Sequence, residues 1–348
     1  MINKKFTICM LLVIALTLAA CGSGASPAPT APAPPVEQSQ QEAGDTTPQS
    51  TPITIRLQGA FHENTDHFYP LPTFIERVYE LSNGSVTVVW GSGPEAIPTG
   101  ELPEAMISGI VELVYAPVTL LATHMPGMAG HNLTDPEVMR QSGGAEFVNS
   151  VTSEAINSQF LARARQGTHF VIGVVDEISS VDELQGRILR GSAANRPLIM
   201  SVGAEMVAMG WGDVYQGLER GVVQGLAGNI QEFVGHSLEG LLGTVVLPGV
   251  FHSDASLLIS NHTWDRLDDI QRSALQTAAV EWGQYTLEFS REQIAEAISA
   301  LEAAGVTILE LEGAERDEFI RRAYEVAWEE AAAADFEMTA SLMHYAGF

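Results

Sequence analysis

The stretch Glu183–Gly225, ELQGRILRGSAANRPLIMSVGAEMVAMGWGDVYQGLERGVVQG, predicts half of an α/β lobe. Short apolar runs alternate in it with polar turns, as strands and helices do in such a unit. We expect strands at Arg187–Arg190, Glu205–Met209 and Gly221–Gly225, a helix at Arg196–Val202, and a helix that Asp213 N-caps and that runs to Glu219. An arginine at the end of such a strand, Arg190, would point at the crevice where open α/β sheets bind ligands.

The same alternation continues outside this stretch. We expect further strands at 53–59, 85–90, 111–115, 169–175, 245–247, 256–260 and 306–311, and helices at 71–81, 101–108, 145–166, 268–303 and 315–333. Strands that alternate with helices at short spacing favour parallel βαβ units. The helix at 268–303 is too long for one small lobe and is expected to span two. The sequence therefore predicts two α/β lobes with more than one crossover.

The N-terminus has the features of a lipoprotein signal peptide at residues 1–20. Lys4 and Lys5 precede an apolar run, Phe6–Thr17, and Leu18–Cys21 (LAAC) is a lipoprotein cleavage box. After cleavage, Cys21 would carry lipid on its sulfur and amine. The apolar run is shorter than the ~20 residues that cross a bilayer. A plain membrane anchor helix is the alternative.

Residues 21–52 form a Pro/Ala/Ser-rich tether with almost no large apolar residues, which would space a folded domain from the membrane. A mucin-like binding role is the alternative. Cys9 and Cys21 are the only cysteines. The folded part therefore has no disulfide, thiolate metal site or cysteine nucleophile, and it must be held by its core alone.

The chain is strongly acidic, with 17 basic residues, 43 acidic residues and a net charge of −26. Without a basic stripe it is not expected to bind nucleic acid. Lys4 and Lys5 are the only lysines, so every basic residue beyond the signal peptide is an arginine. An acidic protein that binds an anion must place such an arginine against its own repulsive field.

Several segments resemble one transport family. Glu183–Arg190 is similar to the pattern D-L-x-G-x-K-I-R, and Met209–Gly225 is similar to M-P-x-x-E-V-Y-x-A-L-x-x-G-V-V-D-G. Gly93–Gly109 resembles G-P-E-x-I-P…E-A-x-x-x-G, and Ile259–Leu267 resembles N-x-x-T-W-x-x-L. These patterns are those of the solute-binding subunit of tripartite ATP-independent periplasmic (TRAP) transporters, the DctP-type family, here in a lipoprotein form. The resemblance covers Thr54 to about Trp328.

The resemblance implies a two-lobed, periplasmic-binding-protein-like clamshell. Lobe I would comprise 53–170 and 254–294, and lobe II would comprise 171–253 and 295–348. Such a protein captures a small organic acid in the cleft between the lobes and delivers it to TRAP membrane permease subunits. It would act at the periplasmic or extracytoplasmic face, held to the membrane only by its lipid, without cofactor, metal or catalysis. The alternative is a clamshell ligand sensor or scaffold lipoprotein that is not coupled to transport.

The resemblance also implies a ligand-binding role for Arg190, whose planar guanidinium would form a bidentate salt bridge with a carboxylate. An ordinary ion pair with a nearby acid is the alternative. Arg187 is expected to face away. Arg196 either anchors the start of a helix or makes a second contact with the anion.

Two further ligand contacts are expected near Arg190. Trp211 occupies a position that often lies near the pocket, although it could instead pack in the core. Many relatives have D-G-x-E-N-P after the third strand, and their asparagine contacts the ligand. Here Gly228 takes that position and Asn229 comes one residue late. A shift of one residue in a strand turns the side chain to the other face.

Lobe I offers Glu95, in a loop with prolines on both sides, and His62 and His67 after the first strand. Glu95 could bind a hydroxyl or a cation, or could be a solvated loop acid. The two histidines could contact the ligand, but they lack a third group for a metal site. The sequence contains no H-E-x-x-H, phosphate loop or G-x-G-x-x-G after a strand, and residues 235–240 (GHSLEG) miss the G-x-S-x-G pattern.

Overall fold

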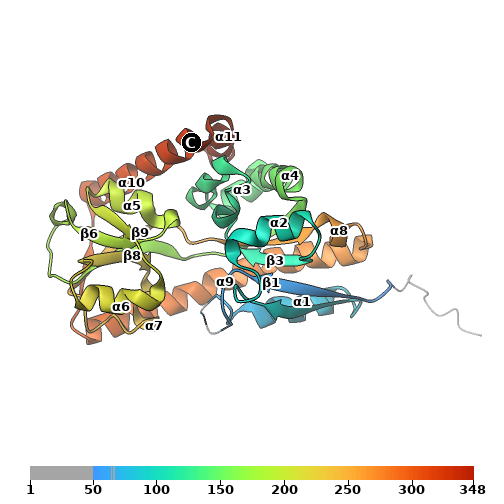
Figure 1. Ribbon diagram of the computed structural model, residues 1–348, viewed down its shortest axis with the longest axis horizontal. Coiled ribbons are helices and arrows are strands. Elements are labelled where there is room, and N and C mark those ends of the chain that lie inside the picture. The colour runs from blue at the N-terminus through green and yellow to red at the C-terminus, as the bar shows by residue number, and fades with distance from the viewer. Residues whose placement is uncertain (1–49, 64, 66) are drawn as a thin grey trace, which may run out of the picture. The chain divides into compact units, whose positions relative to one another are not determined.

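The computed structural model describes residues 50–63, 65 and 67–348 (Figure 1). The predicted signal peptide, Cys21 and all but the last residues of the predicted tether lie outside the described residues. Within the described part of the chain, no helix combines the length and apolar character that crossing a membrane requires.

The first sheet has the strand order β2-β1-β3-β10-β4. β1 is parallel to both β2 and β3, whereas β10 is antiparallel to both β3 and β4. The expected parallel units are therefore only part of a mixed sheet. The strands are β1 (Ile53–Gly59), β2 (Val86–Ser92), β3 (Leu113–Ala116), β4 (Ser158–Arg165) and β10 (Ala255–Ser260).

The second sheet has the order β11-β9-β5-β8-β6-β7. β6 is parallel to β7 and β8, and β9 is parallel to β11, but β5 is antiparallel to both of its neighbours. Its strands are β5 (His169–Val174), β6 (Ile188–Gly191), β7 (Glu205–Ala208), β8 (Gly225–Asn229), β9 (Thr244–His252) and β11 (Thr307–Glu310).

The chain passes between the sheets twice through short strand connections, which we call the crossings. Residues 166–168 join β4 to β5, and residues 253–254 join β9 to β10. The crossings are tied together, because the Ser253 nitrogen donates to the Thr168 carbonyl at 2.9 Å. The strands that adjoin the crossings form the antiparallel pairs β4–β10 and β5–β9. Strands connected through another sheet need no βαβ crossover, which explains why these pairs are not parallel.

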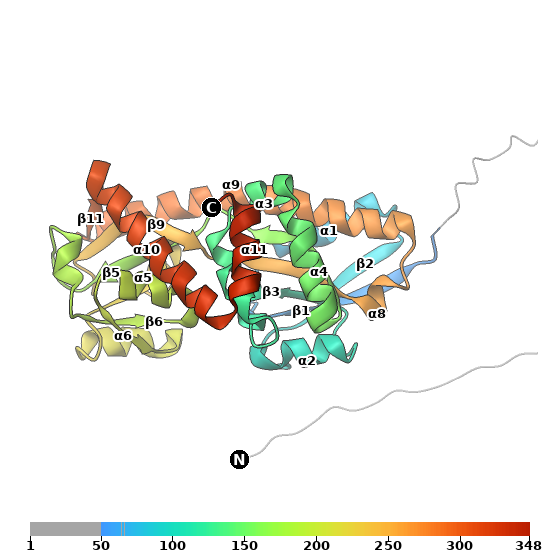
Figure 2. The same cartoon turned by 90° about the horizontal axis from the view of Figure 1, so that it is seen from above.

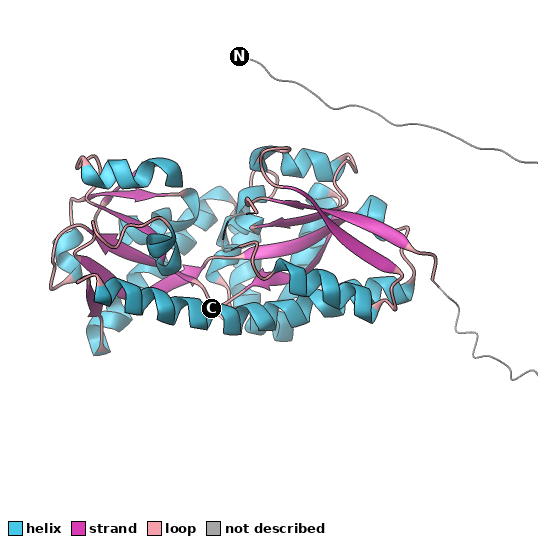
Figure 3. Cartoon of the chain, turned by 90° about the horizontal axis from the view of Figure 1, so that it is seen from below, coloured by secondary structure: helices cyan, strands magenta, loops and turns pink. Residues whose placement is uncertain are grey.

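Helices cover both sheets, as Figures 1 and 3 show. The α-helices are α1 (Leu71–Leu81), α2 (Leu102–Ile107), α3 (Pro136–Ser142), α4 (Gly144–Ile156), α5 (Arg196–Ser201), α6 (Trp211–Glu219), α7 (Ile230–Gly235), α8 (Asn261–Trp264), α9 (Asp269–Ala303), α10 (Gly313–Ala334) and α11 (Phe336–Ala346). The 3₁₀ helices are η1 (Thr99–Glu101), η2 (Val118–Leu121), η3 (Pro126–Leu133), η4 (Val181–Leu184) and η5 (Ala193–Asn195).

Helix α9 serves both lobes, as expected for residues 268–303. It begins where the Asp268 carboxylate accepts a hydrogen bond from the Gln271 nitrogen at 2.9 Å. It then packs against α1 and β4 of the first lobe and against α7 and β11 of the second. Figure 2 shows it running along both lobes. The division into lobes at residues 170, 253 and 294 stays a prediction.

The C-terminal helices also contact both lobes. Helix α10 packs on α5 and on η3, and α11, which the sequence did not lead us to expect, packs on η3, α3 and α4. A buried cluster that includes Phe160, Ile172, Phe251 and Trp328 continues through this region. The core at the crossings is therefore shared by the two lobes, while each lobe also has a smaller cluster of its own.

The long helix expected at 145–166 is wrong. Helix α4 ends at Ile156, where Asn157 takes a left-handed conformation (φ 51°), and β4 follows at once. Leu161, Ala162 and Arg163 have helix propensity, but pairing with β10 overrides it. Most residues of β4 are buried on both faces, so the strand has no apolar–polar alternation to reveal it.

Two details of the stretch at 183–225 are also wrong. Gly210 is the N-cap of α6, and Asp213 lies inside its first turn. The third strand begins at Gly225 and does not start at Gly221, which has a positive φ of 69° and belongs to a turn. The strand expected at 245–247 is also longer than predicted, because β9 runs from Thr244 to His252. Most other boundaries move by no more than two residues, as is usual for element ends.

Gly283 lies where α9 passes the first crossing. A Cβ on this residue would come within 2.8 Å of the Arg163 carbonyl oxygen and 2.5 Å of the Gln166 side-chain nitrogen. We expect Gly283→Ala to lower the free energy of unfolding by about 1–2 kcal/mol, because the cost of overpacking against backbone exceeds the gain of ~1 kcal/mol in helix propensity. Urea unfolding measures the change.

Gly212 in α6 is the matched control, because a Cβ there meets nothing within 4 Å. Gly212→Ala is expected to raise the free energy of unfolding by up to ~1 kcal/mol. If Gly283→Ala raised it as well, the close approach of α9 to the crossing would be wrong.

Candidate ligand-binding site

Arg190 lies near the carboxyl end of β6 and is only 4% exposed. Its Nε donates to the Met209 carbonyl at 2.8 Å, and its Nη1 donates to the Ala227 carbonyl at 3.4 Å. Among residues 50–63, 65 and 67–348, no carboxylate forms an ion pair with it. The guanidinium is therefore held by neutral carbonyls at the carboxyl ends of strands in the second sheet, the place where α/β sheets bind ligands.

Trp211, at the start of α6, lies against this guanidinium. The Arg190 Cζ lies 4.0 Å from the centroid of the indole ring, and the His236 ring stacks on the same indole at 4.7 Å and 3°. Burial lowers the pKa of Arg190, and the charge of Glu232 opposes that shift. A cation in this setting is costly unless an anion joins it.

Asn195 is a site residue that sequence reasoning missed. It is 2% exposed, and its Nδ2 donates to the Ala227 carbonyl at 3.1 Å, the oxygen that Arg190 also contacts. Its Oδ1 accepts from the Ser192 nitrogen at 2.7 Å. The sequence signal was the Ser192-x-x-Asn195 spacing after the strand, which is typical of a turn that caps a helix start.

In the structure, Gly228 and Asn229 have different neighbours. A Cβ on Gly228 would lie 2.9 Å from the Trp211 ring, so the indole occupies the space of a side chain at this position. Asn229 turns elsewhere, and its Nδ2 donates to the Ser253 hydroxyl of the second crossing at 3.1 Å. It thus ties β8 to the connection between the lobes.

The candidates from the first lobe do not form a group with Arg190. His62 Nδ1 lies 3.1 Å from Glu95 Oε2, and both side chains are more than half exposed. The Gly93 nitrogen also donates to Glu95 Oε1 at 2.6 Å. Hydrogen bonds from backbone nitrogens lower the pKa of Glu95, with His62 contributing less. His67 is buried and stacks on Phe61 at 3.6 Å and 8°.

The remaining candidates have partners of their own. Arg196, half exposed at the start of α5, forms an ion pair with Glu330 of α10. Arg187 pairs with Asp176 and donates from Nε to the Glu183 carbonyl at 2.8 Å. In the described part of the chain, no three metal-ligating side chains come together.

Residues 73–335 match the family described as bacterial extracellular solute-binding protein, family 7. The chain belongs to this family. It is 23% identical over 278 residues to the monocarboxylate 2-oxoacid-binding periplasmic protein of Nostoc, a match that covers 74% of this chain and 73% of the relative. The resemblance to the solute-binding subunits of TRAP transporters is thereby confirmed.

Solved structures of other solute-binding proteins share the fold. The ectoine-binding protein TeaA of the TeaABC TRAP transporter, in its apo state, gives a TM-score of 0.74 at 17% identity, covering 85% of this chain and 98% of TeaA. A TRAP periplasmic solute-binding protein of Desulfovibrio salexigens with bound orotic acid gives 0.71 at 15% identity, covering 84% and 97%. The expected α/β clamshell with two lobes is confirmed.

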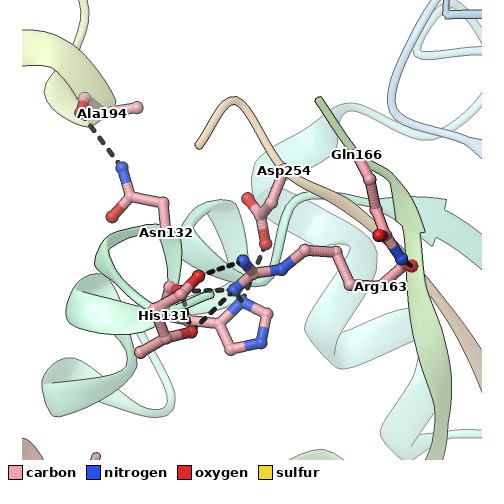
Figure 4. Close-up of polar contacts among 7 residues, drawn as sticks. His131, Asn132, Arg163, Gln166, Ala194 and Asp254 are labelled. Atoms are coloured by element: carbon pink, nitrogen blue, oxygen red, sulfur yellow. Dashed lines mark hydrogen bonds and ion pairs between the residues drawn. The ribbon is translucent and has the colours of Figure 1, made fainter. Parts of the chain in front are cut away.

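A second polar cluster of this solute-binding protein lies beside the crossings, as Figure 4 shows. Arg163, 5% exposed in β4, donates from Nη1 to the Thr134 carbonyl at 2.6 Å and from Nη2 to the His131 carbonyl. His131 Nδ1 lies 2.8 Å from Asp254 Oδ2, and their side chains are 3% and 2% exposed. A neutral His131 donates its Nδ1–H to Asp254, so the Arg163 nitrogen 3.1 Å from Nδ1 makes only an electrostatic contact.

The histidines of this cluster resist protonation. Burial, and then the charge of Arg163, lower the pKa of His131 to about 4, against the opposing effect of Asp254. Burial and the Arg163 charge also lower the pKa of His252 to about 2. His169, whose ring lies 4.7 Å from that of His252, has its pKa lowered by burial.

We expect the solute-binding protein to lose stability as pH falls below about 6.5. Above that value these histidines are neutral in both states. Below it the unfolded chain binds protons that the folded chain refuses, until the pH reaches the folded values of about 4 and about 2. Between these limits His131 and His252 each cost up to roughly 1.4 kcal/mol per pH unit. Urea unfolding from pH 7.5 to 4.5 measures the slope.

His252→Phe should remove one histidine's share of that slope. An equal slope in the wild type and in His252→Phe would show that His252 is not buried in its neutral form.

Proposed function

We propose that this protein captures a small organic acid by its carboxylate, with Arg190 as the anchoring group, and delivers it to TRAP membrane permease subunits. The observation that supports the proposal most is a buried guanidinium that forms no ion pair with a carboxylate of the described residues and is influenced by Glu232 only through its charge. The acidic chain could neutralise this charge with one of its own 43 acids. An anion from outside supplies the missing charge instead.

The donors left on Arg190 suit a carboxylate. A guanidinium has five N–H groups. The contacts with Met209 and Ala227 use one N–H each, which leaves one on Nη1 and both on Nη2. The outer edge of the fork, with one N–H from each Nη, can therefore take both oxygens of a carboxylate.

The relative from Nostoc directs the choice of first probes. Its name assigns it monocarboxylate 2-oxoacids, so pyruvate and its longer 2-oxoacid homologues are the first ligands to test. Their single carboxylate matches a site where one arginine lacks an acidic partner.

Transport requires that the ligand favour a closed form, which it does only through contacts with both lobes. Glu95, His62 and His67 are the proposed partners on the first lobe. Arg196 and Asn229 stay proposed ligand contacts on the second lobe, where Trp211 is proposed to lie at the site beside Arg190. We propose binding without a chemical step and without cofactor or metal.

We expect Arg190→Ala to weaken binding of 2-oxoacids by roughly 2–5 kcal/mol, the cost of removing one partner of a buried charge pair. Arg190→Lys should recover only part of the affinity, because an ammonium lacks the planar fork. Isothermal titration calorimetry with pyruvate and its homologues measures both.

Arg187→Ala is the matched control. Arg187 lies three residues away on the same segment, but it is paired with Asp176. The Arg187→Ala variant should bind the probes as tightly as the wild type does. Equal affinities for the wild type and Arg190→Ala would refute the anchoring role. If a wider panel of organic acids also failed to raise the melting temperature of the wild type, the whole proposal would fall.

We further propose that lipid on Cys21 anchors the protein at the extracytoplasmic face. Cys21→Ser should move the expressed protein from the detergent-rich to the aqueous phase in a Triton X-114 partition, because it loses the acyl chains. Recovery of wild-type protein in the aqueous phase would contradict lipidation.

A further inference from the structure

We propose that Trp211 is a positioning residue, held between Gly228 and His236 as a platform that fixes the orientation of the Arg190 guanidinium. The inference deepens the proposed function and rests on it, because the oriented group is the proposed anchor for the carboxylate. It assigns the indole a role other than direct contact with the ligand.

Three restraints act on the guanidinium. Its Nε donates to the Met209 carbonyl at 2.8 Å, its Nη1 reaches the Ala227 carbonyl at 3.4 Å, and its Cζ lies 4.0 Å from the centroid of the Trp211 ring. The two bonds fix the fork within its plane, and the ring fixes the tilt of that plane. Together they direct the unused N–H groups of the outer edge.

Met209 and Trp211 belong to one short turn. The main-chain carbonyl of the first and the ring of the second contact the same guanidinium, with the N-cap Gly210 between them. A movement of this turn would therefore change two of the three restraints together.

The position of the indole is restrained by its neighbours. A Cβ on Gly228 would lie 2.9 Å from Trp211 Cη2 and 3.0 Å from its Cζ2, so only glycine admits the ring at this depth. The His236 ring is nearly parallel to the indole at a centroid distance of 4.7 Å. Stacking of this kind restrains the tilt of an aromatic ring.

Arg190, Gly228 and His236 each cover part of the ring, and the rest of the side chain is only partly buried. We assign its effect on binding to the orientation of Arg190, which the exchange measurement below separates from a direct contact with the ligand. An arginine that is already oriented loses less conformational entropy when the ligand binds. The smaller entropic cost makes the ligand bind more tightly.

The test compares five variants of the purified protein: Trp211→Leu, Trp211→Phe, Gly228→Asn, His236→Ala and His236→Phe. Two measurements are made on each. The first is calorimetric affinity for pyruvate and its 2-oxoacid homologues. The second needs no ligand: the Nε–H signal of Arg190 in a ¹⁵N–¹H spectrum, with its rate of exchange with solvent, reports the bond to Met209.

We expect Trp211→Leu and Gly228→Asn to weaken binding roughly fivefold to thirtyfold, the range for loss of a desolvated cation–π contact. Both should speed exchange of the Arg190 Nε–H. Trp211→Phe keeps an aromatic face and should stay nearer to the wild type. His236→Ala should act in the same direction as Trp211→Leu, and His236→Phe, which restores a flat ring, should reverse its effect.

Trp264→Leu is the control. The Arg272 guanidinium lies 5.5 Å from the Trp264 ring, a similar pair at the start of α9, away from the site. It should change neither measurement. If Trp211→Leu weakened binding while the Arg190 Nε–H exchanged as in the wild type, Trp211 would be a direct ligand contact and the inference would be overturned. Unchanged affinity and exchange would overturn it as well.

The two proposals fail differently. If no organic acid bound the wild type, the proposed function would fail, while the exchange measurement would still decide whether Trp211 orients Arg190.

Discussion

The buried charge of Arg163 is the constraint on which the connection between the lobes depends. Its terminal nitrogens hold the carbonyls of His131 and Thr134, and Asp254 of the second crossing balances it through the imidazole of His131. Removing one charged member of such a cluster leaves its partner buried without a compensating charge, which strongly destabilises the folded protein. The crossings are therefore fixed by polar groups inside a shared apolar core. The two strand connections between the lobes are held in place by these contacts.

The same contacts lead toward the proposed site. Asn132, next to His131, donates to the Ala194 carbonyl at 3.3 Å. Asn195, next to Ala194, donates to the Ala227 carbonyl, and that oxygen also accepts from Arg190. Adjacent residues and hydrogen bonds thus form a continuous path from the first lobe to Arg190. This path identifies Asn132 and Asn195 as the residues at which energetic coupling between the lobes would be measured.

The sequence predicted the elements whose pattern is local. The helical periodicity of residues 268–303 predicted α9, and the polar turn before Arg196 predicted the start of α5. It failed for β4, because Leu161, Ala162 and Arg163 form a strand only through pairing with β10, which lies about 95 residues away. At the candidate site, the sequence predicted that Arg190 lies at a strand end, but it did not predict which residues contact its side chain. Gly228 seemed to lack a functional side chain, and only the packing shows that the indole of Trp211 fills its place.

Helix α9 has a mechanical consequence. Its 35 residues extend over about 52 Å at the usual helical rise, and both lobes are fastened to it. The lobes cannot change their mutual angle without flexing this rod or releasing one of its contacts. Gly283 lies at the first crossing, where the absence of a side chain lets this helix approach the strand connection closely. Bending of α9 would store elastic energy when the lobes close on a ligand, and that energy would favour reopening when the ligand leaves.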